Sequence, residues 1–229
     1  TLSNPVNGGI GASPGTGTIT NDDVATLTFS GGTSHAAGGV PFTFSANIDK
    51  AVQDGFTITY NTNDGTATLA DNDYTDNDGT LTFSGAANET QTFVVNSTPD
   101  NKVELDETFT TMLAATVGGT SAVQIAAITV TGSPQTGTIT NDDGAMVALA
   151  GSVSQAESLT PQIFTVTLTN PVDVPVTVVF STTNNTASTV DNDYNGIASQ
   201  TVTFPAGTTT SQSVSVTINN DNKVEANEI

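Results

Sequence analysis

The chain contains no cysteine and no tryptophan among its 229 residues. Without cysteine it can form no disulfide framework, no thiolate zinc site and no cysteine nucleophile. Three tyrosines and no tryptophan also leave few aromatic platforms for stacking a sugar. The only histidine, His35, lies in a stretch of glycine, alanine and serine, where we expect an incidental surface residue and not a catalytic base.

Basic residues are almost absent. Three lysines and no arginine stand against 23 acidic residues, which gives a net charge of −20. Binding to DNA or RNA needs clustered cations that neutralise phosphates, so nucleic-acid partners are excluded, and an anionic membrane surface is excluded for the same reason. Enzyme chemistry finds little support either: acids for a carboxylate dyad are plentiful, but no arginine, histidine partner or nucleophile-elbow motif accompanies them. We therefore expect no enzyme.

Long apolar runs are missing as well. No stretch approaches the roughly 20 apolar residues of a membrane-spanning helix, so we expect no membrane insertion. No signal peptide is visible and the chain starts at Thr1 instead of Met, which favours an internal piece of something longer. A cysteine-free composition rich in threonine, asparagine, glycine and serine is common in bacterial surface proteins, so we expect an extracellular location, on the cell surface or secreted.

The acidic excess admits two interpretations. One is a charged surface that keeps the protein soluble. The other is cation binding, because clustered carboxylates repel one another unless a cation lies between them. The acids collect in a few short segments between apolar runs instead of spreading along them. This placement favours metal binding over a merely soluble surface.

The acidic segments are repeated along the chain. Gly-Thr-Ile-Thr-Asn-Asp-Asp occurs at 17–23 and 137–143, Asp-Asn-Asp-Tyr at 71–74 and 191–194, and Asp-Asn-Lys-Val-Glu at 100–104 and 221–225. The copies are 120 or 121 positions apart, a period that means one whole domain per repeat. We therefore expect a complete domain at 24–143, a second at 144–229 that lacks its last strands, and the closing strands of a repeat at 1–23.

Strand signals dominate the sequence and helix signals are nearly absent. Runs of β-branched and aromatic residues alternate with polar ones at period two. In the first full repeat these runs span 25–30, 42–48, 56–61, 80–83, 91–96, 108–117, 124–131 and 136–140. So many short strands predict an all-β fold of tandem immunoglobulin-like antiparallel β-sandwiches. The alternation places Phe42, Phe44 and Ala46 on an inward face, with the threonines between them facing water.

The two ends of the chain match each other in sequence. Residues 13–23 differ from 133–143 at a single position, so the front segment copies the end of a domain. A second sandwich without its last strands would expose its core and two strand edges. Either the next stretch of a longer tandem array fills the gap, which we favour, or the front segment of an identical subunit fills it by strand addition and builds a head-to-tail filament. The expected partners are neighbouring repeats or identical subunits.

Five segments of the first repeat occur in a characteristic order. They are Asp-Gly-Thr-Ala at 64–67, Asp-Tyr at 73–74, Gly-Thr-Leu-Thr-Phe at 79–83, Asp-x-x-x-Glu-x-x-Glu at 100–107 and Gly-Thr-Ile-Thr-Asn-Asp-Asp at 137–143. In this order they resemble the Calx-β repeat, a family known from the calcium-sensing part of sodium–calcium exchangers, from integrin β4 and from large bacterial surface adhesins. The resemblance covers nearly the whole chain. It implies a seven-stranded immunoglobulin-like sandwich that binds Ca²⁺ at one end, near the junction with the next domain.

The resemblance also implies a set of Ca²⁺ ligands. In the first repeat these are Asp64, Asp100, Glu104, Asp142 and Asp143. In the second they are Glu157, Asp221 and Glu225, with Asp22 and Asp23 as closing acids if residues 1–23 complete that domain. Each repeat has lost one ligand: the first has Ala36-Ala37 where the family places a glutamate, and the second has Asn184 at the place of Asp64. A reduced set favours structural binding at extracellular calcium levels over cytosolic sensing.

Chemistry supports the same prediction independently. Ca²⁺ takes six to eight hard oxygens, and the loops at one end of a sandwich converge, so acids distant in sequence can meet there. Alternation along an extended segment would place Asp100 with Glu104 and Asp71 with Asp73. Each repeat also contains a pair of acids that are either ligands or Asx-turn residues, and we expect one of each kind per pair: Asp71 and Asp73, and Asp191 and Asp193.

Three further residue types in these segments have simpler interpretations. Tyr74 and Tyr194 follow the turn acids, and we expect them in the core. Lys102 and Lys223 lie inside acidic segments, and we expect them to lean toward solvent. The function favoured by the sequence is a Ca²⁺-stabilised spacer or filament-forming subunit of a surface or adhesin-like protein. The alternative is a carbohydrate- or cell-surface-binding adhesion module, with a surface glycan or protein ligand on its threonine-rich strands.

Overall fold

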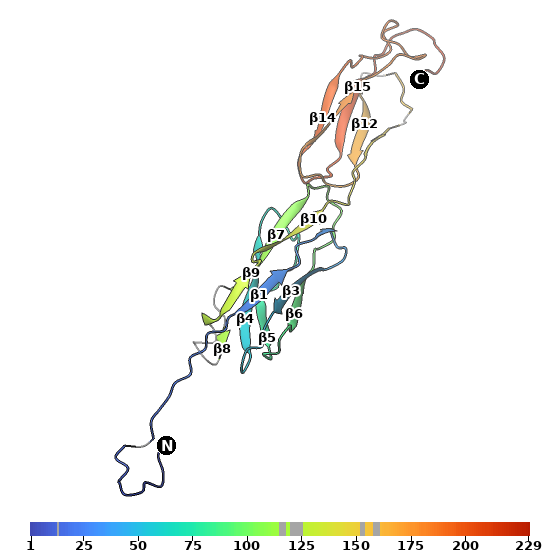
Figure 1. Ribbon diagram of the computed structural model, residues 1–229. Helices are drawn as coiled ribbons and strands as arrows, with labels where there is room; N and C mark the ends of the chain where they lie inside the picture. Colours follow the sequence, from blue (N-terminus) through green and yellow to red (C-terminus); the bar gives the residue numbers. More distant parts are fainter. Residues whose placement is uncertain (13, 115–117, 120–125, 152–153, 158–160) are drawn as a thin grey trace.

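Two separate hydrophobic cores divide the protein. The computed structural model describes residues 1–12, 14–114, 118–119, 126–151, 154–157 and 161–229. One core collects buried residues between Ala25 and Ile139, and the other collects those between Val166 and Val216. The two units lie end to end, with the N-terminal segment extending away from the first unit (Figure 1). The described elements are strands, as the period-two pattern predicts.

The first unit is a sandwich of two sheets. One sheet has the order β6-β3-β1-β9 and the other β2-β10-β7-β4-β5, with β8 pairing β4. The strands are β1 (Ala25–Ser30), β2 (Ser34–Ala36), β3 (Phe42–Ile48), β4 (Phe56–Asp64), β5 (Gly79–Phe83), β6 (Thr90–Val95), β7 (Glu107–Leu113), β8 (Gly118–Gly119), β9 (Ile128–Thr131) and β10 (Gln135–Thr140). The largest differences from the predicted extents are at β4, which continues to Asp64, at β7, which ends at Leu113, and at β9, which begins at Ile128. The predicted residues 115–117 and 124–125 lie outside the described part.

Strand alternation builds the first core as expected. Phe42, Phe44, Ala46 and Ile48 of β3 are fully buried, while Thr43 between them is exposed. Phe44 packs against Phe93 at 5.3 Å between ring centroids. Fully burying one such side chain contributes roughly 1.5–3 kcal/mol relative to leaving it in water. The inward face predicted for this strand is confirmed.

Two strand pairs are parallel, which an all-antiparallel sandwich does not include. β9 runs parallel to β1, and β10 runs parallel to β2. The parallel pairs arise because the chain passes from one sheet to the other twice, once from β1 to β2 and once from β9 to β10, and the two crossings lie side by side. The crossing points are Gly31 and Gly132, both with positive φ. A Cβ at Gly132 would lie 2.2 Å from the Phe29 carbonyl oxygen, so only glycine lets these two segments of the chain cross this closely.

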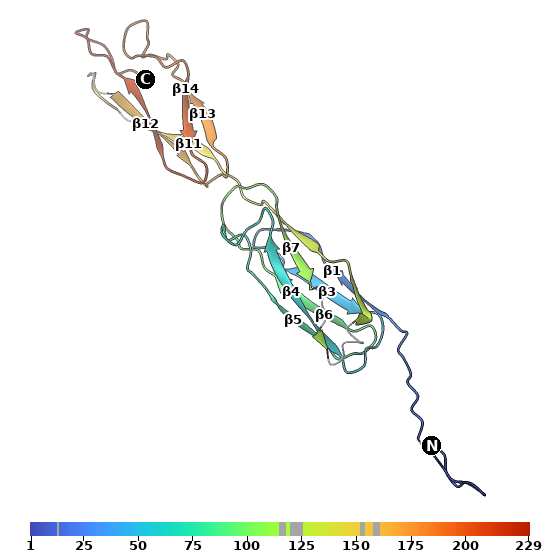
Figure 2. The ribbon, with the colours of Figure 1, turned by 90° about the vertical axis from the view of Figure 1, so that its left-hand side faces the viewer.

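The second unit repeats only part of this plan. β11 (Val147–Ala150), β12 (Pro161–Leu168) and β15 (Gln212–Thr217) form a three-stranded sheet, and β13 (Val176–Phe180) and β14 (Gln200–Phe204) pair with each other. The two sheets face each other at the end of the molecule remote from the N-terminus (Figure 2). The described residues before β1 are all exposed. No helix in the described part of the chain has the length and apolar character that crossing a membrane requires.

Candidate metal sites

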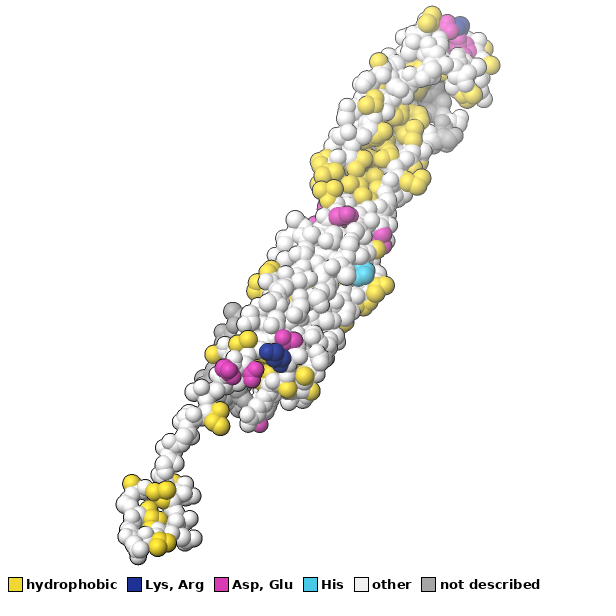
Figure 3. Space-filling model, viewed as in Figure 1, with side chains coloured by type: hydrophobic (Ala, Val, Ile, Leu, Met, Phe, Trp, Pro, Cys, Tyr) yellow, Lys and Arg dark blue, Asp and Glu magenta, His cyan; other side chains and the backbone are white. Residues whose placement is uncertain are grey.

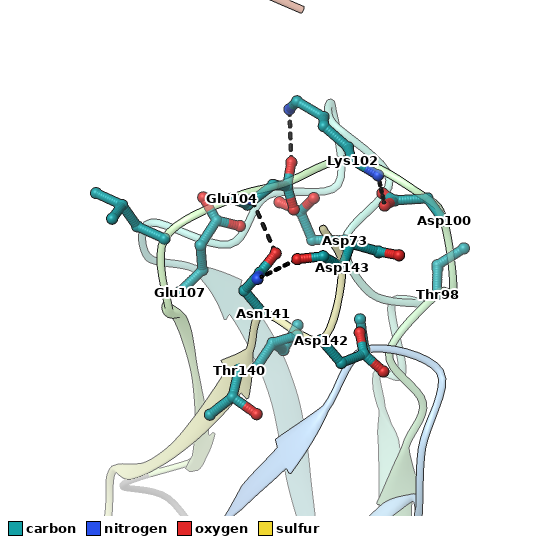
Figure 4. A pocket seen from close by; sticks show the side chains of 13 residues that line it. Asp73, Thr98, Asp100, Lys102, Glu104, Glu107, Thr140, Asn141, Asp142 and Asp143 are labelled. Carbon is teal, nitrogen blue, oxygen red and sulfur yellow. Dashed lines mark hydrogen bonds and ion pairs between the residues drawn. The ribbon is translucent and has the colours of Figure 1, made fainter. Parts of the chain in front are cut away.

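Two groups of acids lie close enough to share a cation among the residues that the structure describes. The first is Asp73, Glu104 and Glu107, with one carboxylate oxygen from each within 4.8 Å of the others. Asp73 comes from the loop between β4 and β5, and the two glutamates come from the segment that leads into β7. These loops meet at the end of the first sandwich that faces the second unit (Figures 1 and 4). We call this group the junction cluster.

A tight turn directs Asp73 into the junction cluster and Asp71 away from it. The backbone N–H of Thr68 donates to Asp73 Oδ2 at 2.6 Å, and the Thr68 hydroxyl bonds Asp71 instead. Asn72 between them has a φ of 66°, a left-handed conformation that breaks the alternation of an extended segment. The expectation that Asp71 and Asp73 share one side is therefore wrong, and the two acids divide into one buried cluster member and one exposed turn residue.

Three more carboxylates line the same small cavity. Asp100, Asp142 and Asp143 surround it together with the junction cluster (Figure 4). Asn141 fixes the arrangement, because its Oδ1 accepts the Glu104 backbone N–H at 2.9 Å and its Nδ2 donates to the Asp143 carbonyl at 2.9 Å. The cavity holds about 10 Å³, roughly one water-sized sphere. It therefore has room for a single ion surrounded by carboxylate oxygens.

The electrostatics of the cavity favour a cation. Burial, together with the charge of Asp73 and a hydrogen bond to it, raises the pKa of Glu107 to about 7. Burial also raises the pKa of Glu104, although Lys102 opposes the shift. Burial and the charges of Asp142 and Asp100 raise the pKa of Asp143. Each upward shift means that the ionised form of the carboxylate is disfavoured at this site, even with Lys102 beside Glu104. A hard divalent cation suits this all-oxygen donor set.

The second unit repeats the cluster at positions 120 or 121 residues later. Asp193, Glu225 and Glu228 bring one oxygen each within 4.8 Å. Burial and the charge of Asp193 raise the pKa of Glu228, as happens at Glu107. Asp221 accepts the Lys223 backbone N–H at 2.7 Å, which copies the 2.8 Å bond from Lys102 to Asp100. We call this group the distal cluster.

Several acids predicted as ligands lie outside both clusters. Glu157 is exposed and borders the same groove as the distal cluster. Asp191 repeats the turn of Asp71 through a Ser188 hydroxyl bond of 3.1 Å. Asp22 and Asp23 are exposed in the segment before β1. This N-terminal segment leaves the first sandwich at the end opposite the second unit (Figure 1). Within one chain, these closing acids are therefore remote from the distal cluster.

Asp64 has a structural role that its counterpart Asn184 preserves. Asp64 Oδ1 accepts hydrogen bonds from the Tyr74 hydroxyl at 2.7 Å and from the Leu69 N–H at 3.1 Å. Asn184 Oδ1 accepts the same pair, from the Tyr194 hydroxyl at 2.6 Å and the Thr189 N–H at 3.1 Å. An amide oxygen thus replaces the carboxylate without loss of either bond. Tyr74 and Tyr194 are buried, as expected.

Sequence reasoning missed Glu107 and Glu228 as site residues. The available signal was their repetition, since each follows a predicted ligand glutamate by three positions in both repeats. Lys102 was also misjudged. Lys102 Nζ forms ion pairs of 2.5 Å with both Glu104 and Asp173, and Lys223 pairs with Glu225. Lys102 therefore turns toward the surrounding carboxylates, whereas Lys223 keeps 58% of its side chain exposed to solvent, as expected.

The junction cluster is joined directly to the second unit. Val103, beside Lys102, forms a parallel bridge with Val172. Its N–H donates to the Pro171 carbonyl at 2.9 Å, and its carbonyl accepts from the Asp173 N–H at 3.1 Å. The segment that supplies Asp100 and Glu104 therefore also holds the next unit. Any ion bound here would act on the connection between the two units.

Comparison with known proteins places this arrangement in a family. The sequence-family model of the Calx-beta domain matches residues 21–144 and again 140–229. The chain belongs to the Calx-beta family. Its two units are tandem Calx-β domains, the tandem β-sandwich fold that the sequence predicts. A search of curated proteins gives no match.

Solved structures that resemble the chain also contain Calx domains. The apo-form Calx CBD1 domain is 22% identical over 53% of this chain and 100% of that one, with a TM-score of 0.44. The calcium binding domain CBD12 of CALX1.1 is 23% identical over 85% of this chain and 76% of that one, with a TM-score of 0.41. CBD12 from CALX1.2 is 22% identical over 84% and 76%, with a TM-score of 0.42.

Proposed function

We propose that this chain is a calcium-stabilised structural repeat, a non-catalytic spacer from an extracellular surface or adhesin-like protein. The observation that carries the proposal is the position of the junction cluster. Its carboxylates line an ion-sized cavity, and the same loop forms backbone hydrogen bonds to the next domain. The donor set consists of carboxylate oxygens alone, which supports Ca²⁺, a hard cation, as the ion.

The residues that would hold the ion are Asp73, Glu104 and Glu107, with Asp100, Asp142 and Asp143 around the same cavity. Bound Ca²⁺ would supply the positive charge that these carboxylates lack. The protein's own part is to hold the oxygens in place through the Thr68 turn and the Asn141 bonds. With the carboxylates neutralised, the Val103–Val172 connection becomes a fixed joint, which is what a spacer requires.

We expect Glu107→Gln to weaken Ca²⁺ binding at the junction by at least about tenfold. The substitution replaces one carboxylate oxygen of the cluster by an amide nitrogen and removes the negative charge. The number of charged ligands sets the affinity of such sites. Isothermal titration of the full chain with Ca²⁺ measures the effect. Asp71→Asn is the matched control, because Asp71 is an exposed turn acid close to the cluster in sequence, and its binding curve should match that of the unaltered chain. Equal affinity in the Glu107→Gln chain would contradict the proposal.

We expect Asp64→Asn to keep the calcium affinity within about twofold of that of the unaltered chain and to leave the melting temperature unchanged. Asn184 already shows that an amide oxygen accepts the same two hydrogen bonds. The same titration and a thermal melt measure this. A loss of binding larger than tenfold would make Asp64 a ligand and would remove it from the purely structural role described above.

A second candidate function, a carbohydrate- or cell-surface-binding adhesion module, is supported only by the exposed threonines on the strands, such as Thr80 and Thr82 of β5. A glycan array with the full chain tests it. Head-to-tail assembly of subunits would depend on the second domain and not on calcium binding.

A further inference from the structure

The second domain exposes residues that are core residues in the first. Leu27 and Phe29 of β1 are 0% and 2% exposed, whereas the residues 120 positions later, Val147 and Leu149 of β11, are 39% and 58% exposed. A groove of about 600 Å³ opens between the two sheets, and its lining combines the distal cluster with apolar side chains that include Leu149, Phe164 and Phe180. Figure 3 shows the resulting apolar patch on this domain. The sandwich is therefore open along one side.

The first domain shows which strands close this side. β9 runs along the free edge of β1, and β10 runs along β2 and β7. In the described part of the second domain, β11 pairs only with β12. Residues 154–156, the counterpart of β2, form no strand there. The open groove thus lies where counterparts of β9 and β10 would sit.

The N-terminal segment carries the sequence that fits this place. Residues 8–20 stand 120 positions before β9 and β10, and 17–20 repeat the Gly-Thr-Ile-Thr of β10. Ile139 of β10 is 7% exposed in the first core, whereas Ile19 in the N-terminal segment is 100% exposed. A Cβ at Gly137 would lie 2.5 Å from the Phe109 ring, whereas a Cβ at Gly17 would meet nothing within 4 Å. A segment that is buried in one domain is therefore displayed to solvent in its other copy.

The fold keeps this segment away from the groove of its own chain. The N-terminal segment leaves the first sandwich at the end opposite the second domain, in both views of the molecule (Figures 1 and 2). The whole first domain separates the two. The segment can therefore reach such a groove only on a second copy of the chain.

We propose that residues 8–20 of a second copy occupy the groove of the second domain and take the places of β9 and β10. The register follows from the first domain. Ala25 pairs with Ile128 and Ile139 pairs with His35, so residue 8 of the incoming copy pairs with Ala145 and its Ile19 with Gln155. The contact is heterologous, because one copy gives its front and the other its rear, and repetition makes an open head-to-tail chain of subunits.

The proposal explains the repeated closing acids as well. Asp142 and Asp143 follow β10 directly and border the junction cluster. If residues 15–20 take the place of β10 in the next copy, Asp22 and Asp23 arrive beside the distal cluster in the same way. Strand addition itself depends on the apolar groove, so it does not require the calcium function proposed above.

Sedimentation velocity of the full chain over a wide concentration range tests the proposal. We expect head-to-tail species that grow with concentration. Ile19→Asp should weaken association by at least about tenfold, because it removes the buried aliphatic anchor and places a charge in the groove. Val40→Asp is the matched control: Val40 is an aliphatic residue, 68% exposed, outside both the tail and the groove, and this variant should associate like the unaltered chain.

A second measurement isolates the groove. A labelled peptide of residues 8–20 should bind the Ile19→Asp chain in a saturable manner, because that chain has an intact groove and a disabled tail, while the same peptide carrying Ile19→Asp should not bind. A chain that stays monomeric at all concentrations and takes up no peptide overturns the proposal. Association that persists unchanged in the Ile19→Asp chain also overturns it, because another segment then fills the groove.

Discussion

Calcium should raise the melting temperature of the first domain by about 6–11 °C. At a Ca²⁺ concentration roughly ten times the 10⁻⁴–10⁻³ M dissociation constants of extracellular modules, mass action adds about 1.4 kcal/mol to the free energy of unfolding. For a domain of about 100 residues, each kcal/mol moves the melting temperature by about 4–8 °C. Thermal unfolding of the full chain with Ca²⁺ and with excess chelator measures the shift.

The same melt discriminates between a specific site and general screening. Glu107→Gln should lose most of the calcium-dependent rise, because the junction cluster loses a ligand. In chelator at neutral pH the variant should melt no lower than the unaltered chain, because the pKa of Glu107 is about 7 and its ionised form is destabilised by burial and by Asp73. Identical melting with and without Ca²⁺ would contradict calcium stabilisation of the first domain.

The pH dependence of the calcium-free protein has a definite sign. The pKa of Glu107 is about 7 in the folded state and about 4.3 in an unfolded chain. Between these values the folded state binds more protons, so the stability of the calcium-free first domain should rise as pH falls from about 7 toward 4.5. Melting in chelator across this range, with Glu107→Gln as the control that removes the effect, checks the direction.

The fold could be predicted because its signal is local. The alternation of Phe42, Phe44 and Ala46 with polar residues determines an inward face whatever the neighbouring strands do, and repetition divides the chain into domains. The parallel pairing of β1 with β9 had no such signal. It arises from the crossing at Gly31 and Gly132, which depends on how distant segments pack.

The candidate site was only partly predictable, because it depends on single backbone and side-chain conformations. Asp71 and Asp73 look equivalent in sequence, and the left-handed Asn72 between them separates a turn acid from a cluster acid. Glu107 begins β7, and its burial beside Asp73 became visible only when the loops were placed. Lys102 turns inward because Asp173 of the next domain comes within 2.5 Å, a contact that no single repeat contains.

Equivalent core positions in the two domains should differ sharply in their contribution to stability. Phe29→Ala should lower the free energy of unfolding of the first domain by about 3–5 kcal/mol, as expected for a fully buried phenylalanine, since Phe29 is 2% exposed. Leu149→Ala, 120 positions later, should lower that of the second domain by less than about 1 kcal/mol, because Leu149 is 58% exposed. Urea unfolding followed by resolved amide resonances of each domain, at low protein concentration, measures the two changes separately.

The effect of Leu149→Ala should depend on the protein concentration. Leu149 lines the groove, so addition of a strand from a second copy would bury it. Leu149→Ala should therefore weaken association several-fold at high concentration while leaving the dilute protein nearly unchanged. A large loss of stability at low concentration would mean that Leu149 already lies in a closed core, and the second domain would then need no added strand. A cost that appears only on association is what an incomplete sandwich predicts, because the missing half of its core is supplied by another segment.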